Sequence, residues 1–354
     1  MNLRRQVGQL IIAGVEGTQL TALERAWLKL IRPGGVILFR RNIEQAPQAT
    51  ALLREVTEIA GAPLFRCVDL EGGLVDRLRD LIAPMPSPAA VFATSRRSTF
   101  QKHGRLIAQE AKALGFNTVF APVLDLALPA SASVMRTRVV SADPKAVAEY
   151  ALAFIEGLEA EGVLGCGKHF PGLGGGTLDS HQSMPLIERT SKELWDEDIA
   201  VFRALAAKLP MIMVAHAAYP QIKSAVPASI SPYWISTVLK KGIGFTGLVV
   251  SDDMEMGGIL TQASMEEAAV KAILAGTDVI EICRDPALVL RAYEALLAEA
   301  ERSAAFRRRV EVTARRVVEH KNRHLDAAMP RPATTAQIDK LRVKVKKFAE
   351  DVSG

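Results

Sequence analysis

The feature that most constrains the fold is a regular alternation of short apolar runs with longer amphipathic segments along most of the chain. Continuous apolar runs of this length are typical of parallel strands that are covered on both faces. Eight such runs, each followed by a segment of helical periodicity, predict a single (β/α)8 TIM barrel, an α/β fold; a doubly wound open sheet is the alternative. The runs cover residues 10–14, 35–39, 64–68, 118–126, 163–167, 211–215, 247–251 and 278–282.

The segments between these runs have recognisable helix ends. Thr21 with Glu24, and Thr190 with Glu193, have the spacing of a capping box, in which two side chains satisfy free backbone amides. Asp285 precedes a proline, which suits the first turn of a helix. We therefore expect helices over residues 21–31, 46–60, 98–114, 144–161, 191–208, 232–241, 265–275 and 286–301.

The domain organisation predicted from these elements is a catalytic barrel over residues 1–325 and a basic helical tail over 326–354. A helix over 336–350 should lie outside the barrel. The net charge is +5, and much of it lies in the basic runs 307–309 and 342–347. We interpret those runs as solvated faces and expect no nucleic-acid partner.

Cysteine usage and the N-terminus indicate where the protein works. Cys67, Cys166 and Cys283 lie singly in apolar runs, which argues against a disulfide framework and for a reducing compartment. The first apolar run is too short for a signal sequence or a membrane span. We therefore expect a cytoplasmic protein without a membrane partner, present as a monomer or weak dimer.

Charged or imidazole side chains follow four of the eight predicted strands. Asp69 follows the third strand, Lys168 and His169 the fifth, His216 the sixth and Asp252 the seventh. Barrel enzymes carry their chemistry at the C-terminal ends of the strands and in the loops after them. The pattern therefore predicts a functional cluster at that end of the barrel.

The loop after the fifth strand, KHFPGLGGGTLDSHQSMP (168–185), is long and rich in glycine. Loops longer than about 12–15 residues usually bind or cover something, and a glycine run can act as a hinge. Asp179 and His181 lie two residues apart, so on an extended segment the carboxylate can bond one imidazole nitrogen and fix the tautomer. The glycines do not match a nucleotide-binding fingerprint.

Three chemistries could use this cluster. A metal-dependent barrel hydrolase could recruit the histidines and Asp252 as ligands, although no HxH or HExxH spacing is present. A Schiff-base lyase could use Lys168. Retaining glycoside hydrolysis needs a carboxylate nucleophile and a proton donor about 5 Å away. Asp252 and the pair of Asp179 and His181 can supply both.

Four motifs, in this order, resemble those of the family-3 glycoside hydrolases: VDLEGGLVDRL (68–78), KHFPG (168–172), DSH (179–181) and GLVVSDDM (247–254). The similarity spans roughly residues 5–320, and the branch resembled is the bacterial β-N-acetylhexosaminidases of cell-wall recycling. It implies a retaining hydrolase that removes terminal β-linked N-acetylglucosamine from small carbohydrate or muropeptide substrates, with no metal and no cofactor.

The resemblance also implies roles for single residues. Asp252 would be the nucleophile that forms a glycosyl-aspartate, and His181 the general acid/base, held by Asp179. Glu71 is expected to hold Arg77 or the loop backbone. The substrate-binding residues would be Asp69, Arg77, Arg138 (with Arg136 as its rival), Lys168 and His169, and we add His216 as a residue that orients a substrate group or the nucleophile.

This chain departs from the family pattern at the rim of the site. Leu173 replaces the histidine of a Pro-Gly-His-Gly motif, and Leu70 and Leu74 replace a polar residue and an arginine. A more apolar rim should change the leaving-group preference. Three alternatives stay open: a β-N-acetylglucosaminide phosphorylase, because a neutral imidazole tolerates an anionic acceptor; a β-glucosidase; and a barrel that only binds sugars.

Overall fold

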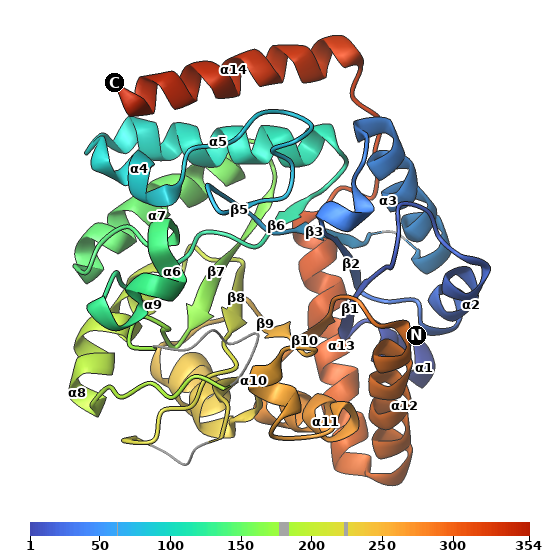
Figure 1. Cartoon of the computed structure of the whole chain (residues 1–354). Helices are drawn as coiled ribbons and strands as arrows, with labels where there is room; N and C mark the ends of the chain where they lie inside the picture. Colours follow the sequence, from blue (N-terminus) through green and yellow to red (C-terminus); the bar gives the residue numbers. More distant parts are fainter. Residues whose placement is uncertain (62, 177–183, 223–225) are drawn as a thin grey trace.

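The computed structural model describes residues 1–61, 63–176, 184–222 and 226–354. Eight parallel strands close into a barrel in the order β1-β10-β9-β8-β7-β6-β3-β2 (Figure 1). The predicted (β/α)8 barrel is confirmed, and the open-sheet alternative is wrong. The barrel strands are β1 (Ile11–Gly14), β2 (Gly35–Leu38), β3 (Phe65–Val68), β6 (Thr118–Val119), β7 (Leu164–Phe170), β8 (Met211–Val214), β9 (Leu248–Asp253) and β10 (Val279–Ile282).

Each predicted apolar run overlaps one barrel strand, but β6, β7 and β9 differ in length from the prediction, and β9 continues to Asp253. β6 ends at Val119 instead of continuing to residue 126, although Cys166 and Lys168 of β7 still donate to the carbonyl oxygens of Ala121 and Pro122 at 2.9 and 3.1 Å. An isolated bridge between Val123 and Lys168 extends this contact. β7 runs on to Phe170, so Lys168 and His169 lie inside the strand and not after it.

Helices surround the barrel, and the longer ones agree with the predicted segments (Figure 1). Thr21 and Thr190 both form the capping boxes that their spacing predicts. No helix among the described residues is long and apolar enough to cross a bilayer. The longer helices are α2 (Ala22–Ile31), α3 (Ala46–Ala60), α5 (Arg97–Ala113), α7 (Pro144–Glu159), α9 (Ile199–Leu205), the π-helix η6 (Tyr233–Gly242), α11 (Met265–Ala275), α12 (Pro286–Arg302), α13 (Ala304–His324) and α14 (Thr335–Ser353).

Several short elements were not predicted, because segments of a few residues carry no measurable periodicity. A two-stranded hairpin follows β3, and short helices lie in the loops at the C-terminal end of the barrel. These elements are β4 (Leu70–Gly72), β5 (Val75–Asp76), α4 (Pro88–Ala93), α6 (Ala132–Met135), α10 (Gly257–Leu260), and the 3₁₀ turns η1 (Arg40–Asn42), η2 (Pro129–Ser131), η3 (Arg136–Arg138) and η5 (Ala228–Ile230). Helix α1 (Leu3–Gly8), also not predicted, precedes β1. The helix predicted over 191–208 is divided into α8 (Ser191–Glu193), the π turn η4 (Leu194–Asp198) and α9.

The barrel interior is closed by apolar side chains, and helix α13 contributes to the same cluster. Val317 of α13 and Leu325 just after it pack with the inward-facing strand residues. Cys67, Cys166 and Cys283 are buried free thiols in this cluster, as their apolar surroundings predict. A filled interior leaves the chemistry to the C-terminal end of the barrel.

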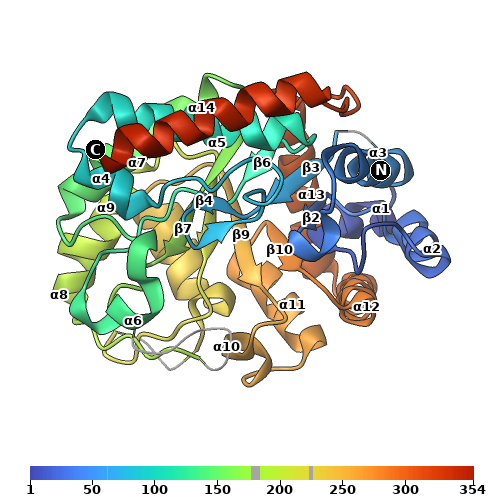
Figure 2. The ribbon, with the colours of Figure 1, turned by 45° about the horizontal axis from the view of Figure 1, so that its top comes forward.

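The basic tail forms helix α14, which lies along α5 on the outside of the barrel (Figures 1 and 2). Its buried face includes Leu341 and Phe348. The Phe348 ring stacks on His103 of α5, with centroids 6.0 Å apart. Arg342 donates to the carbonyl oxygens of Leu81 and Ile82 at 2.8 and 3.0 Å. The tail is therefore packed against the barrel through both apolar and polar contacts.

Replacing Phe348 by alanine should destabilise the whole protein by about 3–5 kcal/mol, the usual cost of emptying a buried phenylalanine site. Urea unfolding measures this change. Val343 on the same helix is 67% exposed, so Val343→Ala is the matched control and should have little effect. Equal effects of the two substitutions would contradict docking of α14.

Candidate active site

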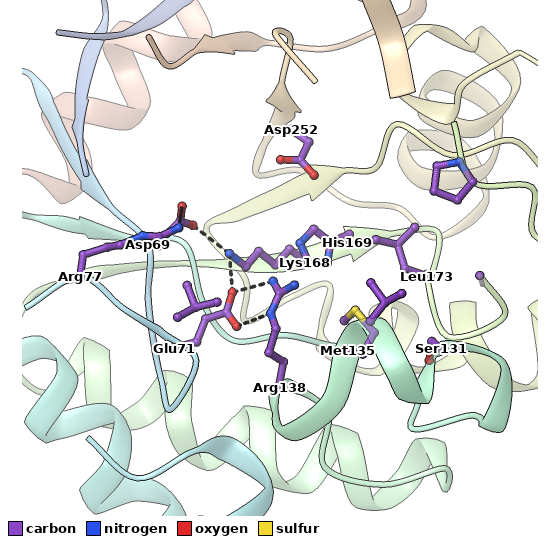
Figure 3. Close-up of a pocket in the computed structure, with 14 residues that line it drawn as sticks. Asp69, Glu71, Arg77, Ser131, Met135, Arg138, Lys168, His169, Leu173 and Asp252 are labelled. Atoms are coloured by element: carbon purple, nitrogen blue, oxygen red, sulfur yellow. Dashed lines mark hydrogen bonds and ion pairs between the residues drawn. The ribbon is translucent and has the colours of Figure 1, made fainter. Parts of the chain in front are cut away.

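A pocket of about 110 Å³ opens at the C-terminal ends of the barrel strands (Figure 3). It brings together six of the residues predicted for the site. Asp179 and His181 lie outside the described residues, and His216 does not line the pocket. The lining consists of Asp69, Glu71, Val75, Arg77, Ser131, Val134, Met135, Arg138, Lys168, His169, Leu173, Gly176, Pro185 and Asp252.

One wall of the pocket is a network of alternating charges (Figure 3). The Lys168 ammonium lies 2.9 Å from Asp69 and 2.8 Å from Glu71. Glu71 also accepts two hydrogen bonds of 2.8 Å from the Arg138 guanidinium. Arg77 lies 3.6 Å from Asp69, so the expectation that Glu71 holds Arg77 or the loop backbone is wrong. Glu71 instead bridges Lys168 on β7 and Arg138 in the loop after β6.

Electrostatics keep this network ionised at neutral pH. Burial by itself would raise the pKa of Asp69, but Lys168 and Arg77 outweigh it and hold that pKa below its usual range. Burial would lower the pKa of Lys168, but Asp69 and Glu71 raise it well above its usual range. A Schiff-base lyase needs a neutral amine, so this environment argues against that role for Lys168. Charged groups fixed in this way suit recognition of sugar hydroxyls.

His169 is held by a residue that the sequence analysis missed. Its Nδ1 lies 2.7 Å from Oδ2 of Asp125, and Oδ1 of the same carboxylate accepts from the Leu173 amide at 2.7 Å. With Nδ1 bonded to a carboxylate, Nε2 is the ring nitrogen left for a ligand. The sequence signal for this residue was a single aspartate within the apolar run 118–126, and it was assigned to the predicted strand instead of to the site.

The two aspartates at the end of β9 have different surroundings. Asp252 lines the pocket, whereas Asp253 accepts from the backbone amides of Glu255 and Cys283 at 3.0 and 3.2 Å. His216 is buried behind this strand end, where its Nε2 lies 3.0 Å from the Asp253 carbonyl oxygen. His216 is therefore placed to position the backbone beside Asp252.

A model of the glycosyl hydrolase family 3 N-terminal domain matches residues 2–320. The chain belongs to glycosyl hydrolase family 3. The family predicted from the four motifs is thereby confirmed, and with it a glycoside hydrolase.

Individual members of the family agree with this assignment. A β-hexosaminidase of Idiomarina loihiensis is 36% identical over 85% of this chain and 91% of its own length. A β-N-acetylhexosaminidase structure from Beutenbergia cavernae has a TM-score of 0.84 at 28% identity, covering 91% of this chain and 99% of its own. A fungal multi-domain family-3 β-N-acetylglucosaminidase has a TM-score of 0.91 at 28% identity, covering 97% of this chain but 43% of its own.

Two glycines at the start of the loop after β7 of this family-3 hydrolase are required by close packing. Gly172 has a φ of 135°, and a Cβ there would lie 2.6 Å from Asp198. A Cβ on Gly174 would lie 2.7 Å from the Leu126 carbonyl oxygen. The Tyr219 hydroxyl donates to the Gly172 carbonyl oxygen at 2.8 Å. The first part of the loop is therefore fixed against the barrel.

The metal-dependent alternative for this hydrolase receives no support from the residues that can be placed. Within the described ranges, no three His, Cys, Asp or Glu side chains are grouped so that they could hold a metal ion. His169 contacts Asp125 through one ring nitrogen, and both ring nitrogens of His216 contact Ser229 and the Asp253 backbone. The lining residues thus offer carboxylates and cations to a sugar.

Replacing Glu71 by glutamine should destabilise this hydrolase by about 3 kcal/mol, because it leaves a buried lysine and arginine without their shared carboxylate. Thermal unfolding measures the change, and KM should rise as Arg138 and Lys168 lose their fixed positions. Glu266→Gln is the matched control, since Glu266 pairs with Arg291 on the exposed surface. Equal losses of stability would contradict a buried network.

The protonation of Asp253 should make the free energy of unfolding depend on pH. Burial raises its pKa to about 7. Between the ordinary aspartate value of about 3.9 and pH 7, the folded state keeps a proton that the unfolded state has lost. The free energy of unfolding therefore falls as pH rises through this window. Asp253→Asn keeps the side-chain oxygen that accepts from both amides, and it should remove this pH dependence of the free energy of unfolding. Urea titrations at several pH values measure the change. A variant with the same pH dependence as the unmodified protein would contradict the assignment to Asp253.

Proposed function

We propose that this protein is a retaining β-N-acetylglucosaminidase with Asp252 as its nucleophile. The observation that carries the proposal is the pocket, where Asp252 faces the network of Asp69, Lys168, Glu71 and Arg138 (Figure 3). The network supplies fixed donors and acceptors for sugar hydroxyls. The carboxylate at the end of β9 is placed to reach the anomeric carbon of a sugar held there.

The proposed reaction has two displacements. Asp252 attacks the anomeric carbon and forms a covalent glycosyl-aspartate, while His181 donates a proton to the leaving oxygen as the glycosidic bond breaks. His181, now neutral, then takes a proton from water, whose oxygen attacks the same carbon and releases Asp252. Asp179 would bond the imidazole and fix its tautomer. An imidazole suits both steps because its ordinary pKa lies near 6.5.

The proposed substrates are terminal β-linked N-acetylglucosamine residues, with peptidoglycan-derived muropeptide fragments as the natural source. The names of the relatives support the sugar, since they are β-hexosaminidases and β-N-acetylhexosaminidases. An imidazole is neutral when deprotonated, so as the acid/base it avoids placing another fixed negative charge near anionic fragments. We further propose a cytoplasmic monomer or weak dimer.

An assay with aryl N-acetyl-β-glucosaminide and aryl β-glucoside, each with and without phosphate, tests the function. We expect hydrolysis of the N-acetyl sugar at a kcat/KM at least about tenfold higher, which corresponds to one lost contact of about 1.4 kcal/mol. Preference for the glucoside would contradict the sugar assignment. Turnover that requires phosphate and releases a sugar phosphate would make the enzyme a phosphorylase.

A further inference from the structure

The lining of the active-site pocket divides into a charged side and an apolar side. Figure 3 shows Asp69, Glu71 and Lys168 grouped on one side, and Met135 and Leu173 on the other. We call the apolar side the apolar wall, and it consists of Val134, Met135, Leu173 and Pro185. The hydroxyls of the transferred sugar match the charged side, so the apolar wall is available for a different part of the substrate.

The apolar wall is held from behind by packed residues. Met135 is 2% exposed and packs with Val123 and Val139 in a small cluster of its own. Leu173 is 9% exposed, and the Asp125 carboxylate that holds His169 also accepts its amide at 2.7 Å. One carboxylate thus sets the position of a sugar-side residue and of the apolar wall. A surface fixed in this way is ready to bind before the substrate arrives.

The direction of the displacement decides which part of the substrate meets the apolar wall. Asp252 enters the pocket from β9, whereas Met135 comes from α6, in the loop that follows β6 (Figure 3). Two strands, β8 and β7, separate β9 from β6 around the barrel, so the two loops face each other across the mouth. A nucleophile needs the leaving oxygen on the far side of the anomeric carbon, which is the side of α6.

We infer that the apolar wall is the subsite for the aglycone and that Leu173 is a specificity-determining residue which favours leaving groups with an apolar surface, such as alkyl or aryl groups. The inference rests on the proposed function. A polar side chain at this position would have to be desolvated by such a group, whereas leucine gains from the contact. Each buried methylene should raise kcat/KM by about fourfold.

Alkyl N-acetyl-β-glucosaminides from methyl to butyl test the inference, because their leaving alcohols have similar basicity and differ in apolar length. In the unmodified enzyme kcat/KM should rise by about tenfold or more over the series. Leu173→Asn, which keeps the branching at Cγ but is polar, should bring the butyl-to-methyl ratio of kcat/KM close to one, and Leu173→Met should keep the ratio. Leu186→Asn is the control, since Leu186 is 45% exposed and lies outside the pocket.

The outcomes separate the inference from the function on which it rests. If no alkyl or aryl N-acetyl-β-glucosaminide is hydrolysed, the proposed function fails. If all are hydrolysed at equal kcat/KM by the unmodified enzyme, the function stands and the aglycone subsite is overturned, whatever the stability of the variants. The aglycone subsite would also be overturned if kcat/KM depended on the length of the N-acyl group and this dependence were lost in Leu173→Asn. The apolar wall would then hold the acyl chain.

Discussion

Asp252→Ala is expected to lower kcat by about 10⁴-fold or more, the scale on which enzymes lose activity when a nucleophile is removed. The carboxylate lines the pocket at the end of β9, where it faces the charged network. Without it, no group at this position can form the glycosyl intermediate, and the first displacement is lost. Steady-state kinetics with an aryl N-acetyl-β-glucosaminide measure the change.

The control for Asp252→Ala is its neighbour on the same strand. Asp253→Asn removes a carboxylate one residue away that is bonded to backbone amides, so it should retain measurable turnover. Both variants should keep the circular dichroism spectrum of the unmodified protein. Residual activity of Asp252→Ala within about tenfold of the unmodified enzyme would contradict the nucleophile assignment.

His181→Ala should have an effect that depends on the leaving group. A general acid contributes about 10²–10⁴-fold where the leaving oxygen needs a proton, and much less where it departs as a stable anion. We therefore expect a large loss of kcat/KM with alkyl or glycosyl leaving groups and a small loss with activated aryl groups. The measurement is kcat/KM over a series of leaving groups of graded pKa.

The partner of His181 provides a second test of the acid/base assignment. Asp179→Asn should lower kcat/KM with poor leaving groups, as His181→Ala does, but by a smaller factor. The imidazole remains in this variant but loses the carboxylate that fixes its tautomer. Equal losses with good and poor leaving groups in His181→Ala would contradict the role. Such a result would indicate that the residue binds substrate and transfers no proton.

Most of the fold could be predicted from the sequence because its signals are local and repeated. Each barrel strand is a continuous apolar run, and each long helix has a periodic face with recognisable ends. The strand predicted over 118–126 was too long because the apolar run continues beyond the regular ladder, which ends at Val119. Short elements such as α6 escaped prediction because four residues carry no periodicity.

The site was predictable in its residue types but not in its pairings. Strand ends identified Asp69, Lys168 and Asp252, since the barrel brings every strand end to one face. Which cation Glu71 holds depends on the direction of loops far apart in the chain, and it proved to hold Lys168 and Arg138. The role of Leu173, visible only as a departure from the family pattern, became interpretable once the pocket lining was known.

A covalent bond between the sugar and Asp252 is the central feature of the proposed mechanism. A slow fluorinated N-acetylglucosaminide, which delays the second displacement, should add one glycosyl unit to the intact protein in mass spectrometry, and peptide mapping should place it on Asp252. Product formed with retained β configuration would accompany the adduct. An unmodified protein that turns over the substrate with inverted configuration would contradict the account.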